Sequence, residues 1–152
     1  MDLAPDFNEF CGLLNEHRVE FVIVGAYALA FHGHPRFTGD FDILVRPTVE
    51  NGERLAAAIA AFGFPTSAFT AADVASGRKV IQMGLEPVQI HVMSDISGVS
   101  WDEVWSTRAP GTCGDHAVSF IGRAAFVKNK RASGRLQDLA DIESLGGGED
   151  PR

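Results

Sequence analysis

The sequence predicts a mixed α/β (α+β) domain with a central β-sheet of about four to five strands flanked by helices. A continuous apolar run over 19–25 indicates a buried strand, and a short helix and a second strand over 40–45 follow it closely. Two further strand-like runs are neighbours at 78–84 and 87–93, and helical segments close the chain. The order is therefore an early strand–helix–strand unit followed by neighbouring strands and helices.

In the first half of the chain, apolar spacing marks each predicted element, and glycine or proline marks most of its ends. The strand runs are apolar and continuous, whereas the helical segments are rich in Ala and Leu. The last helix of this half has Thr48 as its N-cap, with Asn51 as the alternative, and ends near Gly63. The predicted elements are a helix over 6–17, a strand over 19–25, a helix over 26–32, a loop over 32–39, a strand over 40–45 and a helix over 48–62.

The second half contains one ambiguous stretch, 64–77, in which we expect a short helix over 70–76. Cys113, within "GTCGD", is expected to lie in a loop before the final strand. The remaining predicted elements are strands over 78–84 and 87–93, a helix over 100–108, a strand over 116–122, and helices over 122–131 and 134–145.

Composition sets limits on the class of protein. The 152 residues suit one domain, predicted over 1–145, with a disordered tail over 146–152. The formal net charge of -7 argues against a surface built wholly for nucleic-acid phosphates. Two cysteines cannot form a disulfide framework and are typical of free thiols in a reducing compartment. With no signal-peptide pattern and no long apolar segment, we expect a cytoplasmic protein without membrane association.

Two motifs lie close together in the sequence, one at the end of the first predicted strand and one at the start of the second. Gly25-Ala26 stands at a strand-to-helix junction, where unpaired N–H groups suit a phosphate, although many buried strands simply end in glycine. Asp40-Phe41-Asp42 begins the next strand, and alternation places both carboxylates on one face. Paired carboxylates suit Mg²⁺ together with substrate phosphates, unless one Asp caps the loop and the other is solvated.

Positive charge is concentrated near the C-terminus. This segment is either a solvated helix face or part of an anion site. Lys128 and Arg135 are the candidates for reaching a phosphate, although Arg135 is also spaced to pair with Asp138. Five of the 13 basic residues lie here: Arg123, Lys128, Lys130, Arg131 and Arg135.

These motifs carry a resemblance to a known family. The run "VEFVIVGAYALAFHGHPRFTGDFDILV" resembles the nucleotidyltransferase superfamily of polymerase beta-like fold. It is most similar to small bacterial nucleotidyltransferases of abortive-infection and toxin–antitoxin systems. "PVQIHVMSDISGVSWDEVW" and "AAFVKNKRASGRLQDLADIESL" resemble the later parts of such proteins, so the resemblance covers nearly the whole chain. It implies a nucleotidyltransferase fold.

The resemblance also implies an activity. A nucleoside monophosphate would pass from an NTP, with ATP expected, to a hydroxyl of a protein or RNA acceptor, assisted by two Mg²⁺ or Mn²⁺ ions. Asp40 and Asp42 would be catalytic and hold the metal, and Gly25 and Ala26 would meet the β- and γ-phosphates. The expected nucleotide-binding residues are Gly25, Ala26, Arg36, Thr38, Lys128 and Arg135.

The chain departs from the family pattern at the third acidic position, which His91 occupies in "VQIHVM". Neutral imidazole is a poor ligand for Mg²⁺, although it suits a general base. Two interpretations stay open: an enzyme in which His91 is catalytic, and a catalytically weakened binding module acting as an antitoxin or regulatory partner. A third is a hydrolase metal site in which His32 and His34 join the carboxylates and His91.

Overall fold

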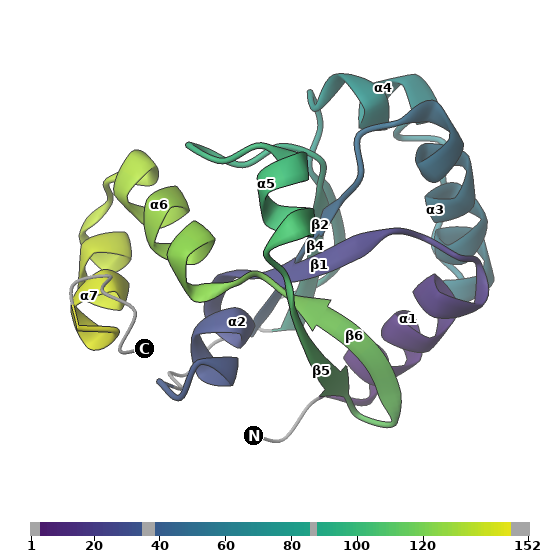
Figure 1. The fold of residues 1–152 in the computed structure, drawn as a ribbon. Coiled ribbons are helices and arrows are strands. Elements are labelled where there is room, and N and C mark those ends of the chain that lie inside the picture. Colours follow the sequence, from purple (N-terminus) through teal and green to yellow (C-terminus); the bar gives the residue numbers. More distant parts are fainter. Residues whose placement is uncertain (1–3, 35–38, 86–87, 147–152) are drawn as a thin grey trace.

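The computed structural model describes residues 4–34, 39–85 and 88–146, and these form one mixed sheet with helices around it (Figure 1). Within the described residues the sheet has six strands in the order β3-β4-β2-β1-β6-β5. The strands are β1 (Phe21–Val24), β2 (Asp40–Val45), β3 (Ile81–Leu85), β4 (Val88–Met93), β5 (Ala109–Cys113) and β6 (His116–Phe120). The predicted fold class is confirmed, with one strand more than the four to five expected.

Helices fill the connections between these strands. The short segment over 70–76 is helical, as expected, because Thr70 caps it and Gly77 ends it in a left-handed conformation. No helix in the described ranges combines the length and the apolar character needed to cross a membrane. The helices are α1 (Pro5–Glu16), α2 (Gly25–Phe31), α3 (Val49–Phe62), α4 (Ala71–Ser76), α5 (Trp101–Ser106), α6 (Arg123–Ser133) and α7 (Leu136–Ser144).

The two strands predicted with the clearest signals form the centre of the sheet. β1 is antiparallel to β2, and β2 in turn is parallel to β4. The hairpins β3–β4 and β5–β6 complete the two sides of the sheet. The Gly25 junction and the Asp40–Asp42 strand are therefore neighbours at the middle of the sheet rather than at its margins.

The two faces of the sheet carry different kinds of side chain. On one face, α1 packs on β2 through Phe7 and Phe41, whose rings stack with centroids 4.7 Å apart. Because side chains alternate along a strand, Asp40 and Asp42 point to the other face. In Figure 1, α6 and α7 lie on that opposite side, away from α1 and α3. One face is thus an aromatic core, and the other holds the carboxylates.

Strand β5 was not expected, and Cys113 is a buried strand residue rather than a loop residue. Pro110 and Gly111 weaken the local strand signal, but an edge strand tolerates both. Gly111 leaves room for the Phe120 ring, since a Cβ there would come within 2.7 Å of that ring. Pairing with β6 therefore overrides a sequence that resembles a loop.

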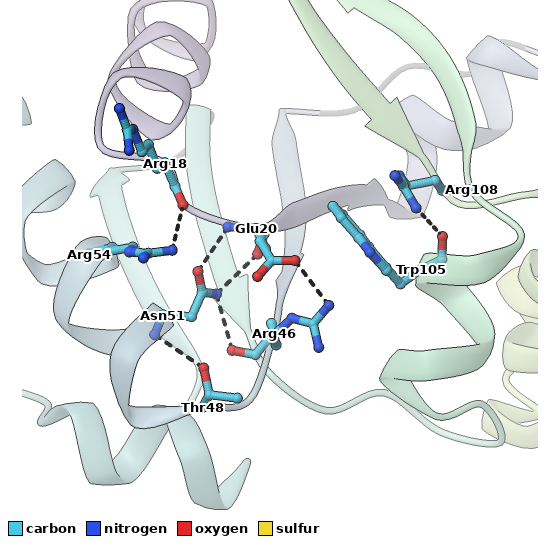
Figure 2. A network of polar contacts seen from close by, with 8 residues as sticks. All are labelled: Arg18, Glu20, Arg46, Thr48, Asn51, Arg54, Trp105 and Arg108. Carbon is cyan, nitrogen blue, oxygen red and sulfur yellow. Dashed lines mark hydrogen bonds and ion pairs between the residues drawn. The ribbon is translucent and has the colours of Figure 1, made fainter.

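Asn51 ties α3 to the two central strands (Figure 2). Its amide oxygen accepts from the Glu20 N–H at 2.8 Å, and its amide nitrogen donates to the carbonyls of Glu20 and Arg46 at 3.1 Å. The N-cap of α3 is Thr48, whose hydroxyl accepts from the Asn51 N–H at 3.1 Å. Asn51 is thus a buried bridge between elements rather than the alternative cap.

We expect Asn51→Ala to lower the free energy of unfolding by about 2–4 kcal/mol, because it removes three partly buried hydrogen bonds and leaves the Glu20 N–H without its acceptor. Arg54→Ala on the same helix removes an exposed ion pair with Glu50 and an exposed hydrogen bond to the Arg18 carbonyl, and it should lower the free energy of unfolding by no more than about 1 kcal/mol. Urea unfolding of both variants measures the difference. Equal losses would contradict the bridging role.

Candidate functional site

The site begins where β1 ends and α2 starts. Gly25, the first residue of α2, has φ +71°, a left-handed conformation that favours glycine. Val24 is paired with Asp42 across the two central strands, which places the Asp42 carboxylate against Gly25. A methyl group on Gly25 would overlap a carboxylate oxygen of Asp42. The glycine is therefore required by the carboxylate beside it as well as by the turn. Ala26 follows it and is buried.

The two acidic residues of β2 differ in their surroundings. Burial raises the pKa of Asp42 and the nearby Asp40 charge adds to that rise, while His91 and Lys130 oppose it. The balance still leaves the pKa of Asp42 above its ordinary value. Asp42 therefore carries a charge that its surroundings only partly compensate, which is the condition under which a cation binds most favourably.

His91 lies directly opposite Asp42 in the parallel pairing of β2 with β4. Its Nδ1 is 3.1 Å from Asp42 Oδ1, and its Nε2 is 3.1 Å from Oε1 of the buried Gln89. Both ring nitrogens are thus engaged within the protein. His91 therefore holds one oxygen of Asp42 from the neighbouring strand.

Cationic side chains approach from the helices that follow the sheet. Lys130 of α6 is buried, with Nζ 3.5 Å from Asp138 Oδ1, and Arg135 Nε donates to Asp138 Oδ2 at 2.8 Å. Burial alone would raise the pKa of Asp138, but the hydrogen bonds from Arg135 and the Lys130 charge hold it below its ordinary value. One carboxylate thus anchors two cations.

These groups meet in one cleft of about 290 Å³. Carboxylate and imidazole come from the sheet, and the two cations come from the helices. The lining residues that carry the argument are Gly25, Asp42, His91, Lys130 and Arg135.

Lys128 lies outside this cleft. Its ammonium is 3.0 Å from Glu103 on α5, and its side chain is 58% exposed. Residues two apart on a helix point in different directions, so only one of Lys128 and Lys130 faces the sheet. The sequence analysis did not select Lys130 as a site residue. It lies four residues after the buried Phe126, which places both on the inward face of the helix.

Two other predicted residues, Arg36 and Thr38, lie outside the described residues. The His-rich alternative finds no support: the ring of His32 is 2.9 Å from the backbone carbonyl of Ile121, and that of His91 is directed to Asp42. Across the part of the chain that the structure describes, no three His, Cys, Asp or Glu side chains are grouped to hold a metal ion.

Asp40 and Asp42 could supply part of the coordination of a divalent cation. Carboxylate oxygens are the ligands that Mg²⁺ and Mn²⁺ prefer, and the Asp42 carboxylate is partly withdrawn from water. With no third ligand grouped among the described residues, such an ion would complete its coordination with phosphate oxygens and water. The site therefore suits a cation that arrives with a phosphate ligand.

Comparison with known proteins bears on the fold. Neither a protein-family model nor a curated protein matches the chain. A "putative nucleotidyltransferase" from Thermotoga maritima does match in structure, with a TM-score of 0.56 and 13% identity over 91% of this chain and 86% of that one. This chain has a nucleotidyltransferase-like fold. An "antigenic nucleotidyltransferase-like protein" from Paracoccidioides brasiliensis has the same fold, with a TM-score of 0.55 and 13% identity over 96% of this chain and 77% of that one.

Replacing Gly25 tests the contact that shapes this nucleotidyltransferase-like site. Gly25→Ala should lower the free energy of unfolding by about 3–5 kcal/mol, because left-handed strain adds to overlap with Asp42. Gly134→Ala is the matched control: its φ is +68° with the nearest atom 3.7 Å away, so about 1–2 kcal/mol is expected. Adding Asp42→Ala to Gly25→Ala should restore part of the lost free energy of unfolding. Equal losses at the two glycines in urea unfolding would contradict the contact.

The partly buried Asp42 and the buried Asp138 should respond to neutralisation in opposite directions. Asp42→Asn should stabilise the fold at neutral pH, because the pKa of Asp42 is raised; the gain disappears as pH falls through that raised pKa towards 3.8. Asp138→Asn should destabilise it at neutral pH, because the pKa of Asp138 is lowered; the loss shrinks as pH falls from 3.8 through that lowered pKa. Urea unfolding between about pH 3 and pH 8 measures both. Changes of the same sign in the free energy of unfolding of the two variants at neutral pH would contradict these two pKa directions.

Proposed function

We propose that the cleft binds a nucleoside triphosphate with a divalent cation and transfers the nucleoside monophosphate to a hydroxyl of a protein or RNA acceptor. The observation that supports this most is the opposition of charges across one cleft. Asp42 stands on the sheet side, and Lys130 and Arg135 stand on the helix side. A triphosphate with its cation presents both signs of charge and fits between them.

Each group has a role in this proposal. Asp40 and Asp42 would hold Mg²⁺ or Mn²⁺, which when bound stabilises charge on the entering and leaving oxygens. Lys130 and Arg135 would bind phosphate oxygens, and His91 would keep Asp42 in its orientation. The acceptor oxygen would form a bond to the α-phosphorus as the bond between that phosphorus and the β-phosphate oxygen breaks, which releases pyrophosphate, and the hydroxyl proton would pass to water.

The second candidate function is a nucleotide-binding module without transfer activity, serving as an antitoxin or a regulatory partner. One observation favours it: His91 at the third acidic position is committed to Asp42 and Gln89 rather than offering a further carboxylate. Binding requires the cations of the cleft, whereas transfer requires the carboxylates as well. The two functions are therefore separable by experiment.

The test is transfer of label from each α-³²P-labelled NTP, ATP first, to protein or RNA of a cell extract with Mg²⁺ or Mn²⁺. Asp40→Asn and Asp42→Asn should each reduce transfer by at least about a hundredfold, because the cation loses a ligand. Asp115→Asn is the control, an exposed aspartate in the β5–β6 turn, and should leave transfer unchanged.

Calorimetry with the same NTPs separates the two candidates. Binding without any transfer would overturn the enzyme and favour the module. If the wild type is silent and His91→Asp produces transfer, then His91 is the reason for the missing activity. Loss of an existing activity in His91→Asp would instead show that the histidine itself takes part.

A further inference from the structure

The two cysteines of the chain lie where α1 packs on the β5–β6 hairpin. Cys11 of α1 and Cys113 of β5 are both buried, with 0% and 3% of each residue exposed. Positions 8, 11, 12 and 15 share one face of α1, because residues three and four apart on a helix are neighbours. That face meets the hairpin on both sides of Cys11. The contacts are Asn8 with Gly114, Gly12 with the ring of His116, and Asn15 with the carbonyl of Ala117.

Cys113 approaches the same turn of α1 from the hairpin. Its thiol donates to the carbonyl oxygen of Phe7, with Sγ 3.8 Å from that oxygen. Phe7 precedes Cys11 by one helical turn, so its carbonyl also accepts from the Cys11 backbone N–H. His116, which is paired with Cys113 across the hairpin, lies against Gly12, the residue next to Cys11. These contacts place the two thiols beside one another, although they are far apart in the sequence.

The two thiols differ in acidity. A hydrogen bond between them raises the pKa of Cys11 and lowers the pKa of Cys113, and burial opposes only the second of these shifts. The thiolate is the form of cysteine that attacks an oxidant, and Cys113 forms it more readily than Cys11 does.

The two thiols also differ in access. Cys113 lines a pocket of about 250 Å³ between α2 and the hairpin, and Cys11 does not. The rings of Tyr27, Phe31 and Phe120 form much of the wall. Hydrogen peroxide is little larger than water, which takes about 30 Å³ in the liquid, so the pocket has room for it beside Cys113.

We propose that Cys11 and Cys113 form a reversible disulfide on reaction with a peroxide, with Cys113 as the attacking thiol and Cys11 as the resolving thiol. The Cys113 sulfur bonds to one peroxide oxygen as the O–O bond breaks, which gives a sulfenic acid and one water. The Cys11 sulfur then bonds to the Cys113 sulfur as the S–O bond breaks, which releases a second water. The two thiols together lose two electrons, and the peroxide takes up both. A small dithiol reverses the reaction by exchange.

The bond joins α1 to the hairpin across about a hundred residues of sequence, and a cross-link over so long a loop stabilises a fold by restricting the unfolded chain. Cys113 lies beside Phe7, on the aromatic face of the sheet, whereas Asp40 and Asp42 lie on the other face. The inference is therefore independent of the proposed nucleotide site.

Equilibration in buffers of reduced and oxidised glutathione tests whether the fold favours the bond. With two cysteines in the chain, every intramolecular disulfide joins this pair, and mass spectrometry after acid quenching gives its fraction. The effective concentration of the two thiols should be at least about tenfold higher in the native protein than in urea, since the fold holds the sulfurs together. The oxidised protein should then have a urea midpoint higher by at least about 0.5 M. An equal or lower native value would overturn the proposal.

Reaction of the native protein with hydrogen peroxide tests the two roles. In Cys11→Ala, dimedone should trap Cys113 as a sulfenic acid, because the resolving thiol is gone. In Cys113→Ala, Cys11 should react at least about tenfold more slowly, because it has no place in the pocket lining. Equal rates would overturn the assignment of roles, and disulfide-linked dimers of the wild type in place of the intramolecular bond would overturn the pair. The glutathione measurement uses no substitution, so it decides the proposal even where a variant does not fold.

Discussion

The contact between the Asp42 carboxylate and the Gly25 backbone is the constraint on which the site depends. It exists because β1 and β2 are antiparallel neighbours with Val24 opposite Asp42. A side chain at position 25 would expel the carboxylate, so the end of β1, the start of α2 and the floor of the cleft are determined together. The Asn51 bridge at the other end of the same two strands holds α3 against them. The central pair is thus fixed at both ends by polar contacts.

Charge in the cleft is balanced between elements distant in sequence. The sheet contributes the carboxylate and the helices contribute the cations, so burial of either alone would be costly. The pKa shifts follow this division: burial holds the pKa of Asp42 high, while Arg135 and Lys130 hold that of Asp138 low. Asp138 stabilises the fold by its pairing, whereas Asp42 is retained at a cost in stability. An unfavourable buried charge is typical of a binding site.

The sequence was sufficient for the central strands, most helices and the Gly25, Asp40 and Asp42 motifs, since continuous apolar runs and alternation are local signals. It failed where partners come from elsewhere in the chain. β5 depends on pairing with β6, and the contact of His91 with Asp42 depends on strand register. To predict Lys130 one would have to know which face of α6 turns towards the sheet. The cluster of basic residues in this segment does not show that face. Motifs were predictable, whereas their partners were not.

The separation of the two kinds of charge has a further consequence for this nucleotidyltransferase-like fold. On the proposed function, phosphate would be bound from α6 and α7, and the cation would be bound from β2 and from what stands opposite it in β4. On the proposed function, a histidine rather than a carboxylate at position 91 would therefore affect the cation side of the cleft, whereas the pairing of Lys130 with Asp138 does not involve it. Loss of the proposed catalysis would then leave the proposed phosphate-binding groups in place. On this proposal the same architecture would serve an enzyme or a nucleotide-binding module, and the side chain that faces Asp42 would distinguish the two.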